Sequence, residues 1–309
     1  MPKNTKPNRT KGDKDSLLAN IALLYYGEGL TQSEIAARMK VSRATIVNML
    51  RDSREKGIVE IRVDGKNLSS SSLARELRQK FDLKDVYVAT SGNGRKTSRA
   101  VLLEHVARVG ATAVLDIVEP GDRIGVAWGE TILALSNVMA RTEIDNVEVC
   151  QLIGSMKSER VPASENCTIQ IANKLGATCF TLHAPGLVAT AEMAQVFRAE
   201  PTIKTQLERL EHLDMTIASI GNTAEETHLA AADMVTAAEL KAARSAGAVG
   251  VLCCRFIDAR GEACRTAPDD RLVTAEVASL KRVPKKLLVV CGIDRAEATL
   301  AALNGGLVT

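Results

Sequence analysis

Apolar positions recur at helical spacing through the first sixty residues of the chain. The spacing predicts a helix from Asp15 to Tyr26 and two shorter helices within residues 31–57. The apolar faces of these three helices are expected to pack on one another, and their members are Leu17, Leu18, Ile21, Leu24, Ile35, Ala36, Met39, Ile46, Val47 and Leu50. Residues 58–63, IVEIRV, alternate between apolar and polar side chains, which predicts a strand.

Residues that cap helices mark the ends of the two shorter ones. Thr31 followed by Glu34 is a capping box, in which each side chain accepts a hydrogen bond from the other residue's backbone. The helix that follows Thr31 is expected to end at Lys40 and Val41, Ser42 can cap the next helix, and Gly57 stops that one. Two helices joined by so short a turn are typical of a helix-turn-helix, which places its second helix in the DNA major groove.

From residue 72 onward, helical spacing alternates with short apolar runs. The runs predict strands at 85–89, 123–128, 147–153, 177–182, 214–220, 249–257 and 285–292. Helices are predicted at 72–81, 99–118, 131–140, 165–176, 202–213, 237–247 and 295–305. Strands that are apolar on both faces are typical of a parallel sheet covered by helices on both sides. The predicted fold class is α/β, with an N-terminal helix-turn-helix followed by a mainly parallel α/β domain.

Charge is distributed unevenly along the chain. Residues 1–66 hold 13 Lys and Arg against 8 Asp and Glu, whereas residues 67–309 hold 27 against 29. A helical hairpin that serves only packing can show the same caps and spacing, but contact with DNA phosphates is the simplest reason for the basic head. The outward residues of the second helix suit this contact, and we assign DNA binding to Ser42, Arg43, Thr45, Asn48, Arg51 and Arg54.

Composition divides the chain into three parts. Residues 1–14 are predicted to be a flexible basic tail, which either contacts the DNA backbone or is only solvated. Residues 15–66 form the predicted DNA-binding domain and residues 67–309 the predicted effector domain. The stretch DGKNLSSSS, residues 64–72, is the expected linker region.

No apolar run reaches the length of a signal peptide core or a membrane span, so no membrane contact is expected. The seven cysteines form no CxxC pair and the four histidines no metal spacing, so no metal and no cofactor are expected. We expect reduced, buried thiols in a cytoplasmic protein, with the vicinal pair Cys253–Cys254 as the one candidate for redox sensitivity. His105 and His212 are expected at the surface.

Small polar residues follow several predicted strands, at the edge where open parallel sheets bind ligands. The clearest case is Gly129, Glu130 and Thr131, which follow the strand at 123–128. The glycine permits a tight turn, and the helix start at Thr131 offers N–H groups and a hydroxyl to an anion such as a phosphate. Glu130 would repel a phosphate, although it can accept hydrogen bonds from ligand hydroxyls. An ordinary strand-to-helix turn with a threonine cap accounts for the same residues.

Other strand ends have the same character. Gly154 and Ser155 follow one predicted strand, Asn222 follows another, and Asp294 and Arg295 follow the last. Small polar residues follow four predicted strands, and this favours a shared cleft for a ligand over four independent turns.

The chain resembles the SorC family of bacterial transcriptional regulators, also grouped with DeoR-type regulators. The resemblance covers nearly the whole chain and rests on SRATIVNMLRDSREKGIVEIRV, PGDRIGVAWGETI, ENCTIQIANKLGATCFTLHAP, EPTIKTQLERLEHLDMTIASIGN, GAVGVLCCRFIDARGE and CGIDRAEATLAALNGGLVT. It implies a winged helix-turn-helix joined to an effector domain that resembles sugar-phosphate isomerases, assembled as a tetramer that controls sugar or polyol operons. Asn166, in the third segment, is placed with the effector-binding residues.

Two positions depart from the family pattern. Val251 follows GAVG where an acidic residue is common, and Arg295 stands where a lysine is common. Arginine keeps the positive charge with a different geometry, so the resemblance does not identify the effector.

The predicted function is a sequence-specific regulator that binds operator DNA as a homo-oligomer and responds to a sugar, polyol or sugar phosphate. The alternative is a sugar-phosphate isomerase-like enzyme that carries a DNA-binding head. Glu130 and Asp294 are the only carboxylates at the predicted strand ends, and no histidine accompanies them, which argues against turnover. An architectural DNA binder without a ligand would leave the large domain unexplained.

Overall fold

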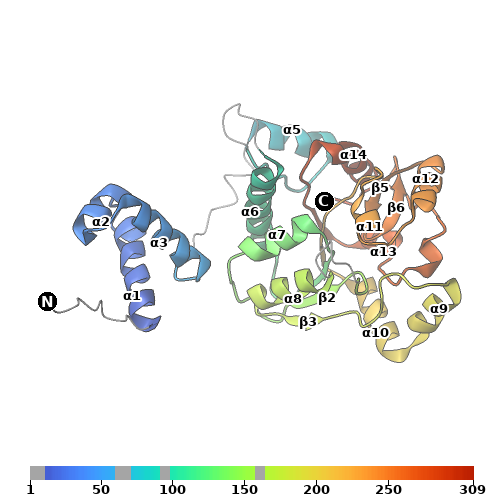
Figure 1. Ribbon diagram of the computed structural model, residues 1–309. Helices are drawn as coiled ribbons and strands as arrows, with labels where there is room; N and C mark the ends of the chain where they lie inside the picture. The colour runs from blue at the N-terminus through green and yellow to red at the C-terminus, as the bar shows by residue number, and fades with distance from the viewer. Residues whose placement is uncertain (1–10, 60–70, 91–97, 157–163) are drawn as a thin grey trace. The chain divides into compact units, whose positions relative to one another are not determined.

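The computed structural model describes residues 11–59, 71–90, 98–156 and 164–309. Its internal contacts divide the chain into two compact units, Met1–Arg62 and Val63–Thr309, and Figure 1 labels their α-helices and some of the strands. The junction predicted between residues 66 and 67 and most of the predicted linker lie outside the described residues, and so does most of the strand predicted at 58–63.

The first unit consists of α1 (Lys11–Ala22), the π-helical turn η1 (Leu23–Gly27), α2 (Gln32–Met39) and α3 (Arg43–Glu55). Its buried cluster joins all three helices through Ile21, Ile35, Ala36, Ile46 and Leu50. The predicted packing of three apolar faces is therefore confirmed. Only the three residues from Lys40 to Ser42 separate α2 from α3, as a helix-turn-helix requires.

The predicted caps of α2 and α3 are present. The Glu34 N–H donates to the Thr31 hydroxyl at 3.3 Å, and the Thr31 N–H donates to the Glu34 carboxylate at 2.7 Å. The Thr31 hydroxyl also donates to the Glu34 carboxylate at 2.7 Å, and the two hydrogen bonds that this carboxylate accepts from Thr31 lower the pKa of Glu34. The Ser42 hydroxyl accepts from the Thr45 N–H at 3.1 Å. Lys40 adopts φ of 56°, the left-handed conformation that ends a helix.

Two expectations about the first unit are wrong. The helix α1 begins at Lys11, so residues 11–14 do not belong to a flexible tail. Asp13 lies in the first turn of α1, where a carboxylate interacts favourably with the helix dipole and stabilises the helix. Val47 is 43% exposed rather than buried, because the inward stripe of α3 follows Ile46 and Leu50 and the next residue is rotated by about 100°.

A five-stranded sheet with the order β3-β2-β1-β4-β7 forms the centre of the second unit. All four pairings are parallel, which confirms the predicted mainly parallel sheet. The strands are β1 (Arg123–Val126), β2 (Glu148–Gln151), β3 (Thr178–Phe180), β4 (Met215–Ala218) and β7 (Lys285–Leu288).

Helices cover this sheet on both faces. The helices of the second unit are α5 (Ser72–Phe81), α6 (Arg99–Ile117), α7 (Glu130–Val138), α8 (Ser164–Leu175), α9 (Ala191–Ala199), α10 (Pro201–Arg209), α11 (His228–Ala231), α12 (Ala237–Ser245), α13 (Val277–Arg282) and α14 (Ala296–Asn304), with the 3-10 turns η2 (Leu210–His212), η3 (Asp269–Arg271) and η4 (Ile293–Arg295). One buried cluster joins the strands to α6, α7 and α8, and a second joins them to α12, α13 and α14. The sequence pattern does not predict α9, α11 or α13.

The segment 85–89, predicted as a strand, forms none. Its apolar side chains are half-buried, and the Tyr87 hydroxyl donates to Asp116 of α6 at 3.4 Å. The segment is thus tied to a helix rather than to a neighbouring strand. His105 of α6 is half-buried, against the expected surface position, and its Nδ1 has no hydrogen-bond partner among the described residues.

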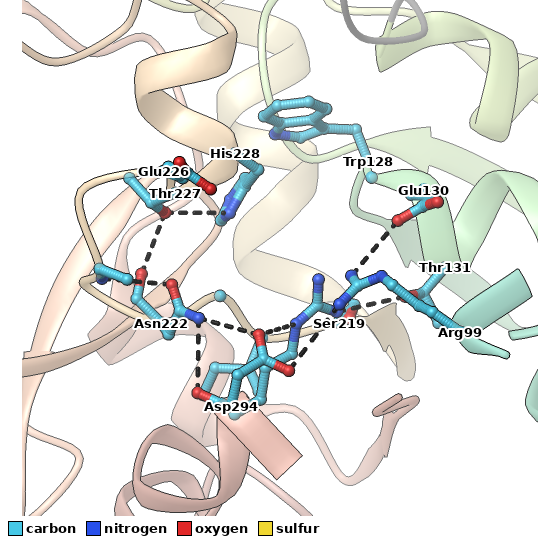
Figure 2. A pocket seen from close by; sticks show the side chains of 15 residues that line it. Arg99, Trp128, Glu130, Thr131, Ser219, Asn222, Glu226, Thr227, His228 and Asp294 are labelled. Carbon is cyan, nitrogen blue, oxygen red and sulfur yellow. Dashed lines mark hydrogen bonds and ion pairs between the residues drawn. The ribbon is translucent and has the colours of Figure 1, made fainter. Parts of the chain in front are cut away.

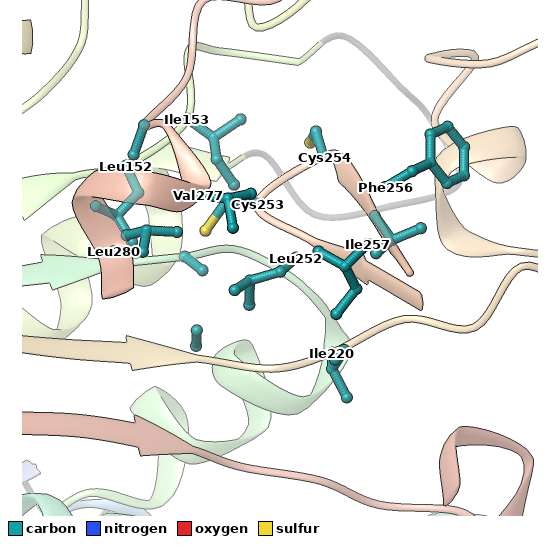
Figure 3. Close-up of a cluster of buried hydrophobic side chains, with 14 of the residues drawn as sticks. Leu152, Ile153, Ile220, Leu252, Cys253, Cys254, Phe256, Ile257, Val277 and Leu280 are labelled. Atoms are coloured by element: carbon teal, nitrogen blue, oxygen red, sulfur yellow. The ribbon is translucent and has the colours of Figure 1, made fainter. Parts of the chain in front are cut away.

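The single strand predicted at 249–257 is an antiparallel hairpin. It consists of β5 (Ala248–Leu252) and β6 (Arg255–Asp258), joined by Cys253 and Cys254. Both cysteines have positive φ, 49° and 67°, which is the signature of a two-residue type I′ turn. The turn is buried in the second cluster, as Figure 3 shows, so it carries none of the polar residues that usually mark a turn.

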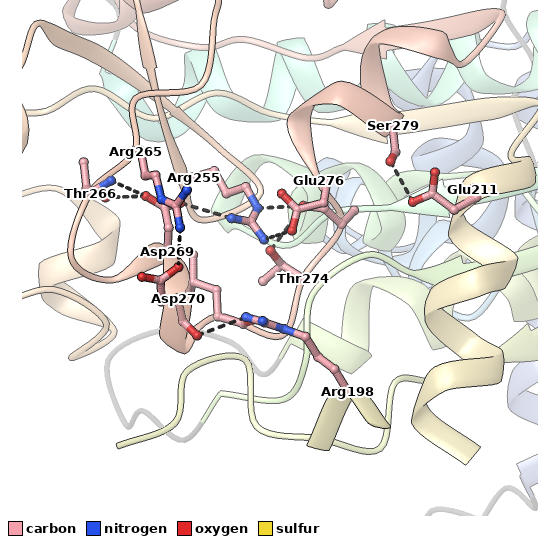
Figure 4. Close-up of polar contacts among 12 residues, drawn as sticks. Arg198, Glu211, Arg255, Arg265, Thr266, Asp269, Asp270, Thr274, Glu276 and Ser279 are labelled. Carbon is pink, nitrogen blue, oxygen red and sulfur yellow. Dashed lines mark hydrogen bonds and ion pairs between the residues drawn. The ribbon is translucent and has the colours of Figure 1, made fainter. Parts of the chain in front are cut away.

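A buried arginine ties this hairpin to the segment that follows it. The Arg255 side chain is only 6% exposed, donates to the Ala275 carbonyl at 3.0 Å, and forms ion pairs with Asp269 at 3.1 Å and with Glu276 (Figure 4). A buried cation destabilises a fold unless it is paired, so these partners hold the segment in place.

All seven cysteines are free thiols. No helix in the described part of the chain is both long and apolar enough to cross a membrane.

The amino ends of β1 and β2 are held by a second ion-pair group. Glu148 accepts hydrogen bonds from Arg123 and from Arg209, both at 2.8 Å, and the Arg209 guanidinium lies 3.7 Å from the centre of the Phe180 ring. Burial acts to raise the pKa of Glu148, but the hydrogen bonds from the two arginines outweigh it and lower the pKa.

We expect Glu148→Gln to reduce the free energy of unfolding by about 1–2 kcal/mol at pH 7, because both arginines lose a charged acceptor. The pKa of Glu148 is lower in the folded state, so its contribution is complete above the unfolded value of about 4.3 and is lost as the pH falls through the folded value. Urea unfolding should therefore separate the two proteins at pH 7, and the difference should shrink progressively as the pH falls below about 4.3.

The matched control is Glu143→Gln, the same change in an ion pair with Arg141 whose side chains are 73% and 66% exposed. It should change the unfolding free energy little at either pH. A Glu148→Gln protein as stable as the wild type at pH 7 would contradict the assigned role of the pair.

Candidate functional site

A cavity of about 590 Å³ opens beside the segments that follow β1, β4 and β7, three strands that are neighbours in the sheet (Figure 2). Its position agrees with the rule that parallel sheets bind ligands at the carboxyl ends of their strands. The lining residues are Arg99, Trp128, Gly129, Glu130, Thr131, Ser219, Ile220, Gly221, Asn222, Ala224, Glu226, Thr227, His228, Asp294 and Arg295.

Most of the residues predicted to bind the effector meet in this cavity. Gly129, Glu130 and Thr131 line one side, and Asn222 and Arg295 come from the two neighbouring strand ends. The shared cleft expected from the sequence therefore exists for these three strand ends. Gly154, Ser155 and Asn166 do not line it.

Packing accounts for the small residues after β2. A Cβ atom on Gly154 would lie 2.5 Å from the Ala184 carbonyl oxygen and 2.7 Å from the Gly186 nitrogen, so the glycine is required by a close approach of two backbones. The Ser155 N–H donates to the same Ala184 carbonyl at 2.8 Å. Asn166 lies exposed on α8. A small residue after a strand thus has two explanations, and sequence alone did not separate them.

The amino end of α7 provides a polar corner of the cavity. Gly129 caps the helix with φ of 134°, and the first hydrogen bond of the helix runs from the Leu133 N–H to the Gly129 carbonyl at 2.9 Å. The N–H groups of the first turn have no acceptor within the helix. Arg295, whose side chain is 13% exposed, donates to the Thr131 hydroxyl at 3.3 Å. A helix start beside a cation attracts an anionic group.

Arg99 of α6 links the two carboxylates at the mouth of the cavity. Its guanidinium lies 3.4 Å from the Glu130 carboxylate and 3.8 Å from the Asp294 carboxylate (Figure 2). Asn222 donates to Asp294 at 2.9 Å. The repulsion that Glu130 would exert on an anion is therefore offset by a neighbouring cation. Arg99 begins a helix and does not directly follow a predicted strand, so the sequence pattern did not single it out.

His228 also lines the cavity, so the expectation that no histidine accompanies the carboxylates is wrong. Its ring lies 5.4 Å from the Trp128 ring, centre to centre, at an angle of 59°. Burial, and then the charge of Arg295, lower the pKa of His228 to about 4, so the imidazole is neutral at physiological pH. His228 begins the four-residue helix α11, which is too short for a periodic pattern of apolar residues to predict.

The cavity offers both donors and acceptors to a ligand. Ser219 lines it with a buried hydroxyl that has no hydrogen-bond partner among the described residues. Two cations, Arg99 and Arg295, face three carboxylates, those of Glu130, Glu226 and Asp294. Within the described ranges, no group of three His, Cys, Asp or Glu side chains is placed to hold a metal ion. Such a lining suits a ligand with several hydroxyl groups, with room for an anionic group beside α7.

In the first unit, the residues predicted to contact DNA lie along α3. Arg43, Asn48, Arg51 and Arg54 are exposed, and Arg43 donates to Gln32 of α2 at 3.3 Å. The Ser42 and Thr45 hydroxyls lie 2.8 Å apart at the start of the helix. Val47 lies exposed between Arg43 and Arg51 at intervals of four residues, so these three side chains share one outward stripe.

Known proteins resemble the chain over almost its full length. The family described as "Putative sugar-binding domain" matches residues 66–309. The chain is 34% identical over 297 residues to an uncharacterized transcriptional regulator, YjhU, of Escherichia coli strain K12, covering 96% of this chain and 90% of the relative. It is 28% identical over 294 residues to the deoxyribonucleoside regulator of Bacillus subtilis strain 168, covering 95% and 93%.

Solved structures agree with these relatives. The crystal structure of the full-length sorbitol operon regulator SorC from Klebsiella pneumoniae matches with a TM-score of 0.71 at 25% identity, covering 96% of this chain and 94% of that one. Because the sugar-binding family matches residues 66–309 and a regulator 34% identical spans 96% of the chain, the protein belongs to the SorC family of transcriptional regulators.

Proposed function

We propose that this regulator binds operator DNA through residues 15–66 and a sugar, polyol or sugar phosphate through residues 67–309. The observation that carries the proposal is the meeting of Thr131, Asn222 and Arg295, from three strand ends, in one polar cavity. Relatives are named a deoxyribonucleoside regulator and a sorbitol operon regulator, which supports an effector from the class of sugars and polyols.

The cavity is proposed to bind its ligand without turnover. A proton-transfer enzyme at neutral pH needs a base whose pKa lies near 7. His228, with a pKa of about 4, is a weak base, and the Glu130 and Asp294 carboxylates are engaged by Arg99. Incubation with pentose and hexose phosphates, followed by NMR of the sugars, tests the isomerase alternative; steady formation of an isomer would establish it.

On the DNA side, we propose that Arg43 and Asn48 read bases, with Ser42 and Thr45 beside them at the helix start, while Arg51 and Arg54 hold phosphates. The exposed Val47 adds an apolar side chain to the same stripe, suited to the methyl group of a thymine.

Arg43→Ala should weaken binding to an operator selected from random-sequence DNA by about 1–3 kcal/mol and change binding to unrelated DNA little, because a base contact is lost. Fluorescence anisotropy at moderate salt measures both affinities. Arg54→Ala is the comparison variant: as a phosphate contact, it should weaken both by similar factors and reduce the salt dependence. If Arg43→Ala leaves the affinity for the operator unchanged, the proposed assignment of α3 as the base-reading helix is wrong.

The protein is further proposed to act as a homodimer or homotetramer. One helix-turn-helix reads only a few base pairs, so specific binding usually pairs two half-sites about one helical turn, or a multiple of it, apart. Light scattering at micromolar concentration should give the mass of a dimer or a tetramer. A monomer in both the presence and the absence of operator DNA would refute the proposed assembly.

The effector should be found by thermal shift with sugars, polyols and their phosphates, and its affinity measured by calorimetry. Thr131→Val should weaken binding by about 1–3 kcal/mol, because a hydroxyl is removed while the shape is nearly kept. Arg295→Ala should cost more for a phosphorylated effector, since charge-assisted hydrogen bonds are stronger.

Arg260→Ala, at a side chain that is 83% exposed and does not line the cavity, is the control and should leave the affinity unchanged. A confirmed ligand that is indifferent to both Thr131→Val and Arg295→Ala binds elsewhere. A ligand that tolerates Arg295→Ala but is lost with Glu130→Ala is a neutral sugar or polyol.

A further inference from the structure

The imidazole of His228 is held from several sides. A Cβ atom on Gly221 would lie 2.0 Å from His228 Cε1, so the ring occupies the space that any larger residue at 221 would fill. Gly221 is itself fixed by two hydrogen bonds to Val251 of β5, both 2.9 Å long. The Trp128 ring lies on another side of the imidazole, 5.4 Å away between ring centres.

Trp128 is fixed in turn by the buried hairpin turn. Its Nε1–H donates to the Sγ of Cys254 at 3.4 Å, and the indole is only 6% exposed. The polar atom of the tryptophan is therefore already engaged, and the indole serves to support His228. Cys254 is a positioning residue in this arrangement, since it acts through Trp128.

A hydrogen-bond chain determines which nitrogen of His228 carries the proton. The Thr227 hydroxyl lies 3.0 Å from the Asn222 carbonyl oxygen, which can only accept, so the hydroxyl proton points there. The Thr227 oxygen can then only accept from His228 Nδ1, which lies 3.4 Å away. Nδ1 thus bears the hydrogen, and Nε2 of the neutral ring bears a lone pair.

Nothing in the described part of the protein uses that lone pair, since the only hydrogen bond of the His228 ring there runs through Nδ1. The ring is half-buried and lines the cavity (Figure 2). Its burial and the nearby Arg295 keep it neutral, as its lowered pKa reflects. A neutral, immobilised acceptor at the wall of a cavity matches a hydroxyl donor better than an anion.

We infer that His228 Nε2 accepts a hydrogen bond from a hydroxyl group of the effector and thereby selects it over the analogue that lacks this hydroxyl. The inference rests on the proposed function, because it adds a specificity-determining contact within the same cavity. A site with a dedicated partner for a hydroxyl discriminates against the deoxy compound because its own polar group is then left unpaired.

The first test needs no ligand. Histidine-selective ¹⁵N labelling at pH 7 gives the protonation of each ring nitrogen, and His228→Gln identifies the His228 signals among the four histidines. The expected result is a protonated Nδ1 and an unprotonated Nε2. A protonated Nε2 would overturn the inference and leave the proposed function standing.

The second test uses calorimetry with the tightest-binding sugar or sugar phosphate of the thermal-shift panel and with its monodeoxy analogues. His228→Phe keeps a ring of similar shape without an acceptor, and it should lower the affinity about 10- to 100-fold. One monodeoxy analogue should bind the wild type more weakly than the parent sugar by a similar factor. The His228→Phe variant should bind this analogue and the parent sugar equally well, since both changes remove the same contact. His228→Gln, which supplies a carbonyl acceptor, should bind better than His228→Phe.

Emission from Trp128, the only tryptophan, shows whether each variant keeps its packing. Arg260→Ala again serves as the neutral control. If a folded His228→Phe protein binds the sugar as the wild type does, this inference fails while the effector site stands. If no sugar, polyol or sugar phosphate binds the wild type, the inference and the proposed function fall together.

Discussion

The parallel pairing of β1, β4 and β7 is the constraint on which the rest of the effector unit depends. Parallel strands end on the same side of a sheet, so the segments after them are brought together although they lie far apart in the chain. Burial on both faces holds that pairing in register. Side chains pack closely on the central strand β1: a Cβ atom on Gly125 would lie 2.6 Å from Leu152 and 2.7 Å from Leu213.

The two ends of this sheet use charged residues differently. At the amino ends, Arg123 and Arg209 both donate to Glu148, so the carboxylate is paired by residues of the chain itself. At the carboxyl ends, Arg99 and Arg295 are only partly engaged by carboxylates and face an open cavity. The first arrangement stabilises the fold, and the second retains donors and acceptors for a ligand. Similar residue types therefore serve structure or recognition according to how completely they satisfy one another.

The hairpin β5–β6 connects the core to the cavity. Its turn residues adopt positive φ in a buried position, which costs free energy for residues other than glycine and is tolerated only where the surroundings hold the turn. Cys254 of this turn accepts a hydrogen bond from the Trp128 indole. Val251 of the hairpin exchanges two backbone hydrogen bonds with Gly221, which packs against the His228 ring, and the Val251 side chain is buried in the core.

Sequence alone determined the features that depend on neighbours within a few residues. Thr31 with Glu34 specifies a helix start, and Gly129 specifies a strand-to-helix turn, because capping and tight turns are local interactions; α7 begins at Glu130, and Thr131 does not cap it. Parallel strands also follow from the apolar runs, which is why most of the predicted effector residues meet in one cavity. Only the tertiary structure decided which small residues line the cavity.

Gly154 and Gly129 look alike in the sequence, yet Gly154 is packed against another backbone and Gly129 lines the cavity. His228 and Arg99 escaped prediction for the same reason, since neither follows a strand and each reaches the cavity through contacts between segments distant in the chain. Long-range packing set these positions, and a local pattern carries no record of it.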